Sequence, residues 1–475
     1  MTIKHIALAV AGLLGLTSCD KYLDITPTGS QLVETTQDFY ELVAWPNRGY
    51  PINNFQYLVD DQWLKESNVI GVAANMNTIN FLFQDDADRV RRIASSSMYN
   101  QTYKYIGQWN NIISLVDEST GDADLKQLAK AEAKVFRAFD HFLLINVYAK
   151  AYDATTAATD GGIAIMDKYD LEAVPTKSTV QQVYDFIQKD IDEAIPYLQE
   201  KPGNVYHPSL AFAWAFKAKV HLFKREITQA KEAALKALTY NDKLFDLVDL
   251  ASKGGPTVLN VPAANNPEVL SYQYITGYNE MNFGYNYIIS PELTSMFKSA
   301  DDKRFTLFFN TTNNSLQDAA AGTSYYVMTY TRFFYPTVGM KTPELYLMLA
   351  ECYAREDNYQ QAVDMLNTLR KTRIAGSDAV LTAPNTRKET MDLVINERRK
   401  ELPFGYHRFF DLKRLNIEPE YAKTVVRKFP IVSTAVPQET YTLEPNSRMY
   451  IIPFPLDVME KNPNIRLNTN EVVPF

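Results

Sequence analysis

The segment from Thr342 to Leu402 constrains the fold most strongly, because its apolar residues recur with the period of an α-helix. Thr342-Pro343-Glu344 is typical of a helix start. Thr is the expected N-cap, Pro fits where an N–H has no partner, and Glu suits the positive end of the helix dipole. Only a polar turn at 356–358 separates the apolar face of the helix that begins here from the apolar face of the next helix. Because so short a turn makes neighbouring helices antiparallel, the segment predicts a helical hairpin.

A second hairpin of the same kind is predicted at 208–239. The separation from Ala218 to Ala230 equals that from Ala350 to Ala362 in the later hairpin, and each pair spans the turn in the same way. Small residues at such positions let two helices approach closely, as in stacked tetratricopeptide units. The repeat indicates a tetratricopeptide-like scaffold, although neither copy carries the full tetratricopeptide pattern.

Irregular, aromatic-rich segments surround the predicted helices. We expect a mainly α fold in which one body, 36–475, combines a helical-hairpin scaffold with an aromatic-rich loop lobe and a few short β-hairpins. The scaffold is predicted at 90–240 and 341–415. The segments assigned to the lobe are 36–89, 241–340 and 416–475.

The N-terminus reads as a targeting signal. Lys4 precedes an apolar run that is too short for a permanent membrane helix, and Leu16-Thr17-Ser18-Cys19 resembles a bacterial lipobox. This predicts a signal peptide at 1–18, an acylated Cys19 carrying lipid such as palmitate, and a tether at 19–35. The alternative is an ordinary cleaved signal with an incidental cysteine.

Aromatic residues beside acids and amides in the lobe suggest a sugar-binding surface. The candidates for ring stacking on apolar sugar C–H groups are Trp63, Tyr278 and Tyr285, and those for holding hydroxyls are Asp61 and Asn282. For any single ring, packing in the core is the competing interpretation, because most aromatic side chains are buried.

Composition and motifs argue against several other functions. The net charge is −8 and no long basic run occurs, so nucleic acid is not an expected partner. The five histidines are scattered and no metal-binding or cofactor-binding motif appears, so we expect neither a bound metal ion nor a cofactor. The acid pairs Asp60-Asp61, Asp85-Asp86 and Asp301-Asp302 could serve a glycosidase or a calcium site, but such pairs are more often solvated surface.

A charged block at 397–415 leaves two interpretations open. Arg398, Arg408 and Asp411 could contact a ligand, or they could form a buried network of ion pairs and hydrogen bonds. We favour the network, because buried arginines must be paired and carboxylates lie close by in the sequence. The apolar residues expected to pack beneath it are Phe404, Phe409 and Leu412.

Two C-terminal blocks carry a family resemblance. The first runs Glu397-Arg398-Arg399-x-Glu401-Leu402, then His407-Arg408-Phe409-x-Asp411-Leu412-x-Arg414. The second runs Tyr450-x-x-Pro453-x-Pro455, then Asn462-Pro463-Asn464 and Asn468. Together with Cys19 and the helical repeats, they resemble the SusD/RagB family of Bacteroidetes surface lipoproteins. Glu460 stands near the usual position of a glutamate, and Arg466 stands where family members often have Gln.

The resemblance implies a non-catalytic lipoprotein of the outer membrane that faces the cell exterior. Such a protein binds a nutrient, oligosaccharide before peptide, and delivers it to a TonB-dependent SusC-like transporter. Two other functions stay open from the sequence. One is a lipoprotein glycoside hydrolase, and the other is a tetratricopeptide scaffold that binds peptide or protein.

Overall fold

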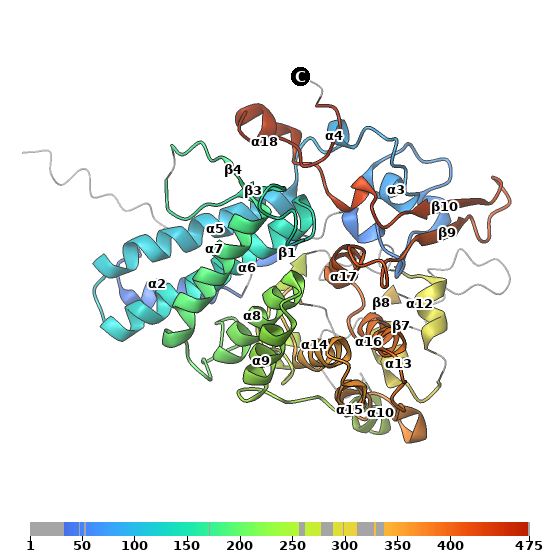
Figure 1. The fold of residues 1–475 in the computed structure, drawn as a ribbon. Helices are drawn as coiled ribbons and strands as arrows, with labels where there is room; N and C mark the ends of the chain where they lie inside the picture. The colour runs from blue at the N-terminus through green and yellow to red at the C-terminus, as the bar shows by residue number, and fades with distance from the viewer. Residues whose placement is uncertain are drawn as a thin grey trace, which may run out of the picture.

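Helices dominate the architecture, and the strands are few and short (Figure 1). The computed structural model describes residues 33–46, 48–51, 54–170, 172–255, 262–276, 288–297, 299–310, 327–328 and 337–473. Cys19 and most of the predicted tether lie outside these residues. The predicted mainly α class with helical hairpins is confirmed.

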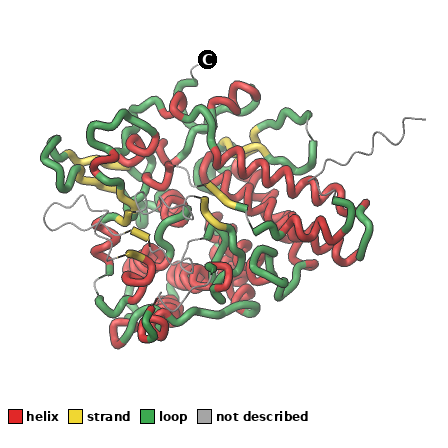
Figure 2. The backbone as a smooth tube through the Cα atoms, turned by 180° about the vertical axis from the view of Figure 1, so that it is seen from behind, coloured by secondary structure: helices red, strands yellow, loops and turns green. Residues whose placement is uncertain are grey.

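The long helices fall into an N-terminal and a C-terminal group. Their bounds are α5 Ser97–Leu115, α6 Ala123–Tyr148, α7 Val180–Ala194, α8 Leu210–Lys224, α9 Ile227–Leu238, α14 Thr342–Arg355, α15 Tyr359–Arg370, α16 Arg387–Glu401 and α17 His407–Leu415. Helix α8 packs on α9 and α14 packs on α15, while α9 contacts α14, so the two predicted hairpins lie side by side. Seen from behind, the N-terminal helices lie together at one side of the molecule (Figure 2).

The two hairpins share the geometry of their turns. Arg225 and Asp357 occupy the same position relative to the repeated alanines, and both have a left-handed backbone with φ 62°. Non-glycine residues adopt this conformation in only a few per cent of cases, so its recurrence supports a true repeat. The repeated alanines at the helix contacts are all buried: Ala218, Ala230, Ala350 and Ala362.

The start of α14 differs from the prediction by one residue. Lys341 is the N-cap and Thr342 is already helical, so the predicted capping role of Thr342 is wrong. Instead, the backbone N–H and the hydroxyl of Thr342 both donate to the Glu268 carbonyl, at 2.8 and 3.3 Å. This acceptor is distant in the sequence, so the local pattern gives no sign of it. Pro343 lies in the first turn, as expected.

Helix α6 lies at the centre of the main core. Every residue from Val135 to Tyr148 is buried. Asp140 accepts hydrogen bonds from the Tyr50 hydroxyl at 2.7 Å and from the Trp109 indole N–H at 2.6 Å. Burial raises the pKa of Asp140 to about 7, although both hydrogen bonds oppose the rise. Within the described ranges, no helix combines the length and apolar character needed to cross a membrane.

Short strands and helices connect the remaining segments. The strands are β1 Gly49–Pro51, β2 Gln62–Trp63, β3 Gly161–Ala164, β4 Lys177–Thr179, β5 Tyr274–Thr276, β6 Ile288–Ile289, β7 Phe309–Asn310, β8 Val327–Met328, β9 Val425–Phe429 and β10 Glu439–Leu443. The short α-helices are α2 Thr36–Val43, α3 Met76–Phe81, α4 Arg89–Arg92, α10 Leu247–Ser252, α12 Pro291–Met296, α13 Lys303–Phe308 and α18 Leu456–Lys461. Strands β1 and β5 pair in parallel, β9 and β10 form an antiparallel hairpin, and β2, β6, β8 and β7 form one antiparallel sheet in that order.

The charged block forms buried ion pairs that join α14, α16 and α17. Asp411 accepts from Arg398 and Arg414, each at 2.9 Å. Arg414 also donates two 2.7 Å bonds to Glu351, which accepts from Arg355 at 3.0 Å. The predicted network is therefore confirmed. The apolar residues expected beneath it are indeed buried: Phe404, Phe409 and Leu412.

Glu351→Gln should reveal how much this network contributes. Burial alone would raise the pKa of Glu351, but Arg414 and Arg355 outweigh it and lower the pKa from 4.5 to about 2. The folded-state pKa is depressed, so the charged Glu351 stabilises the fold above pH 4.5, and this contribution is lost as the pH falls toward 2. We expect the substitution to cost about 3 kcal/mol at neutral pH, because the buried Arg414 and the half-buried Arg355 each lose one of their carboxylate partners.

The free energy of unfolding is measured by urea titration with circular dichroism as the signal, at several pH values from neutral down to about pH 3. The difference between variant and wild type should shrink through the acid range. Glu232→Gln, an exposed change on α9, should stay within about 0.5 kcal/mol of wild type. A constant difference at all pH values would contradict the ion-pair account.

Candidate ligand-binding site

Asp60 and Asp61 lie just before β2 and are bound by arginines of the C-terminal helices. Arg408 donates two 2.7 Å bonds to Asp60, and Arg399 bonds Asp61 at 2.8 and 2.5 Å. The solvated surface expected for this acid pair is therefore wrong, since the two residues are only 4% and 3% exposed. Burial would raise the pKa of Asp60, but Arg408 and Arg399 hold it well below its usual value.

The other two acid pairs are only partly solvated. Asp302 is buried and bonds Arg304 at 2.8 and 2.7 Å, so a solvated surface is wrong for it. Asp85 is exposed and pairs with Arg448 at 2.6 Å. Among the described residues, no group of three or more His, Cys, Asp and Glu side chains is placed to hold a metal ion.

Trp63, a predicted stacking residue, packs inside the lobe. It is 5% exposed and meets Phe81 edge-on at 5.2 Å, while the Arg427 guanidinium lies 5.5 Å from its ring centroid. In the part of the chain that the structure describes, its indole N–H has no hydrogen-bond acceptor. Asp61, predicted to hold a ligand hydroxyl, is occupied by Arg399. In this conformation neither side chain is open to solvent, and their ligand-binding roles stay predictions.

The other predicted contacts, Tyr278, Asn282 and Tyr285, lie outside the described residues. The structure does place the neighbouring chain, because Trp63 in β2 pairs with Ile288 in β6. These three residues stay predictions.

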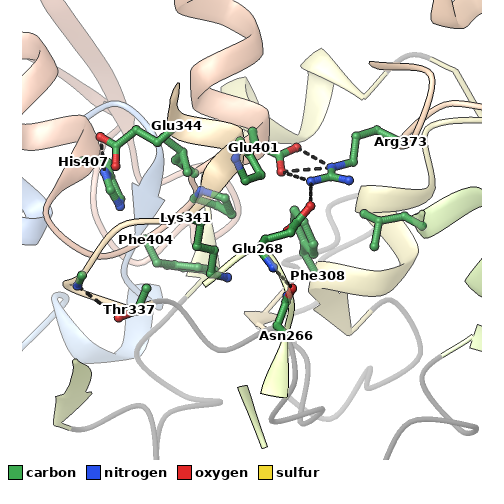
Figure 3. A pocket seen from close by; sticks show the side chains of 15 residues that line it. Asn266, Glu268, Phe308, Thr337, Lys341, Glu344, Arg373, Glu401, Phe404 and His407 are labelled. Atoms are coloured by element: carbon green, nitrogen blue, oxygen red, sulfur yellow. Dashed lines mark hydrogen bonds and ion pairs between the residues drawn. The ribbon is translucent and has the colours of Figure 1, made fainter. Parts of the chain in front are cut away.

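A small cavity lies between α10, α13, α14, α16 and α17 and the loop residues around Glu268 and Lys341 (Figure 3). Arg373 crosses its wall and donates to Glu268 at 2.6 Å and to Glu401 at 2.8 Å. Burial lowers the pKa of the neighbouring Lys341, although Glu268 and Glu401 oppose the shift. The cavity measures about 50 Å³, which holds water but no sugar ring. This cavity is therefore a small gap in the packing beside the ion-paired Arg373.

A larger pocket of about 450 Å³ opens where four distant segments meet. We call it the C-terminal pocket, and its segments are the loop 150–160 after α6, the end of α17 with the two residues after it at 413–417, the stretch 445–451 and the stretch 468–469. Its volume lies in the range of small-molecule sites, about 300–1,000 Å³. Sequence reasoning missed this pocket, because no local motif indicates that these four segments come together.

Two family models match the chain in succession. Residues 21–222 match a SusD-like model described as "Starch-binding associating with outer membrane", and residues 271–470 match the SusD_RagB model of the SusD family. Together the two models span most of the chain, and the second one contains both C-terminal blocks.

Similar proteins agree with these matches. "SusD-like protein P2" of Formosa agariphila is 23% identical over 444 residues, with 82% of each chain covered. A crystal structure of a SusD superfamily protein from Bacteroides thetaiotaomicron superposes with a TM-score of 0.73 at 20% identity, covering 92% of this chain and 99% of that one. A structure titled "Laminarin binding SusD-like protein" has a TM-score of 0.61 at 16% identity, with 90% and 98% covered. The chain belongs to the SusD/RagB family.

Proposed function

We propose that this chain is an outer-membrane lipoprotein that binds an oligosaccharide at the cell surface and passes it to a TonB-dependent SusC-like transporter. The observation that carries the proposal is the succession of the two family models, the first of which is described as starch-binding and outer-membrane-associated. A laminarin-binding protein with the same fold supports carbohydrate as the ligand class. The lipobox at Cys19 supports attachment through acyl chains, because the chain's net negative charge would not attract it to anionic lipid.

The environment of the paired acids supports binding over hydrolysis. A glycosidase needs two carboxyl groups that face its substrate, one of which must give or take a proton. Asp60, Asp61 and Asp302 are buried in direct ion pairs with arginines. A carboxylate held in this way is poorly placed to reach a glycosidic bond.

The aromatic and amide residues that precede β6 in the sequence are the proposed ligand contacts. Tyr278 and Tyr285 would stack on sugar rings, and Asn282 would hold hydroxyl groups. Trp63 and Asp61 belong to the adjoining strand β2 and the residues just before it, and their side chains are packed here, so their contacts with ligand stay predictions.

Native affinity electrophoresis tests the proposed function. The chain from residue 20 onward, which contains every described residue, is run through gels that each contain one polysaccharide. We expect slower migration in at least one glycan and no new reducing ends in the same samples. Release of new reducing ends would contradict the proposal in favour of a hydrolase. Unchanged migration in every glycan would contradict an oligosaccharide ligand.

The double variant Tyr278→Ala, Tyr285→Ala tests the proposed contacts and leaves the packed Trp63 intact. We expect binding of the retarding glycan to weaken about tenfold, because each stacked ring contributes about 0.5–1.5 kcal/mol. The matched control is Tyr169→Ala, Tyr197→Ala, which removes two exposed tyrosines from the N-terminal half. Wild-type affinity in the first double variant would rule out these two rings as the stacking platform.

A further inference from the structure

An apolar groove of about 250 Å³ opens between α2 and α5, which both pack on α6. We call it the N-terminal groove. Phe39 and Ile112 line it and are buried. Its other apolar lining residues are all exposed: Val33, Leu42, Trp45 and Leu115. Trp45 is 46% exposed, although Trp is one of the largest apolar side chains. Exposed apolar residues gathered at one groove indicate a contact surface.

The N-terminal segment of the chain enters the fold at this groove. Val33 is the first described residue and itself lines the groove. Two backbone hydrogen bonds fix the chain there. The Thr120 N–H donates to the Glu34 carbonyl at 3.3 Å, and the Thr36 N–H donates to the Thr120 carbonyl at 3.0 Å. The segment before Val33 therefore begins from a fixed point at the edge of the groove.

The sequence of that segment favours a return of the chain to the same point. Thr26-Pro27-Thr28-Gly29 has proline at the second and glycine at the fourth position of a β-turn, which is typical of type I. A turn there makes 22–25 antiparallel to 30–33 and brings Tyr22 opposite Val33. The returning stretch is mostly apolar or aromatic, with Tyr22, Leu23 and Ile25.

The charges around the groove favour the chain's own segment over a membrane or a second copy. Residues 34–45 contain Glu34, Asp38 and Glu41 and no Lys or Arg. An anionic lipid surface, or the same groove of a second copy, would bring like charges together. Lys21 instead supplies a positive charge directly beside Tyr22.

The family match also includes this segment. The first family model begins at residue 21, so 21–32 is similar in sequence to other members of the family. A linker that is needed only for its length does not require a particular sequence, because exposed terminal segments tolerate change. The match is therefore consistent with a segment that makes specific contacts.

We propose that residues 22–25 dock in the N-terminal groove, with Leu23 and Ile25 against Leu42 and Trp45. Leu23 and Ile25 are two residues apart, so in an extended segment both side chains lie on the same face. That face covers apolar surface that is otherwise exposed, and burying it favours the docked state.

Docking changes how the body is attached to the membrane. It leaves only Asp20 and Lys21 between the docked segment and Cys19. With acyl chains at Cys19, the groove side of the body lies nearest the membrane and the tether has little free length. This consequence rests on the proposed function, whereas the docking itself does not.

Disulfide cross-linking in the chain from residue 20 onward tests the docking. One variant carries Leu23→Cys and Leu115→Cys, and its matched control carries Thr28→Cys and Leu115→Cys. Cys352 is buried and does not compete. Cross-linking is started with oxidised glutathione and followed by mass spectrometry of tryptic peptides.

The order of the two rates distinguishes a docked segment from a flexible one. In a flexible segment the shorter loop closes more readily, so the Thr28→Cys variant would react faster. A docked segment holds residue 23 beside residue 115 at high effective concentration, so we expect the Leu23→Cys variant to react at least about tenfold faster. A Thr28→Cys variant that reacts as fast or faster would overturn the docking.

A substitution in the groove locates the docked segment. Trp45→Ser removes the largest exposed side chain, so cross-linking of the Leu23→Cys, Leu115→Cys variant should slow about tenfold. Tyr197→Ser removes an exposed aromatic ring elsewhere and should leave the rate unchanged. Circular dichroism should show both variants folded. Cross-linking at an unchanged rate after Trp45→Ser would mean that the segment does not occupy this groove.

Two further outcomes would assign the groove to another occupant. One is binding of the chain from residue 20 onward to vesicles of phosphatidylethanolamine and phosphatidylglycerol, if Trp45→Ser abolishes it. The other is self-association, measured by light scattering, that is lost in the same variant. Either result would overturn docking of residues 22–25. Absence of glycan retardation would contradict only the proposed function, so the two failures are distinguishable.

Discussion

Buried ion pairs between arginines and carboxylates hold the irregular lobe against the helical scaffold. Arg399 and Arg408, on the C-terminal helices, bind the acids of the segment before β2, at Asp61 and Asp60. An unpaired buried charge destabilises a fold by several kcal/mol. Conformations in which each arginine contacts its acid are therefore much more stable than conformations in which it does not. These ion pairs fix the position of segments that have little regular secondary structure. Apolar contacts are less directional, so a hydrophobic core alone would define that position less precisely.

The sequence predicts features that depend on residues close together in the chain, and it misses features that depend on residues far apart in the chain. Helices and the alanine-marked hairpins depend on neighbours within a few turns, and the local pattern predicts them. The burial of Asp61 depends on an arginine 338 residues away, so local reasoning treats the acid as solvated. The same limit explains the error at Thr342, whose partner is Glu268, and the absence of any sign of the C-terminal pocket.

Family membership and pocket chemistry address different questions about function. The first family model is described as starch-binding and associated with the outer membrane, but a shared fold does not identify the ligand of this chain. Ligand identity depends on particular side chains at the binding surface. The arginines Arg398, Arg399, Arg408 and Arg414 form ion pairs with buried carboxylates of the fold.

The most direct test of the ion-pair account is hydrogen exchange, measured by mass spectrometry, of Arg399→Met. The account predicts faster exchange at 54–66 and 288–297, because Arg399 pairs with acids in both segments, while α14 and α15 keep their protection. Arg387→Met, which removes an exposed pair on the same helix, should leave exchange unchanged. Unaltered exchange at 54–66, or an equal loss of protection throughout the scaffold, would contradict the claim that these pairs hold the lobe in place.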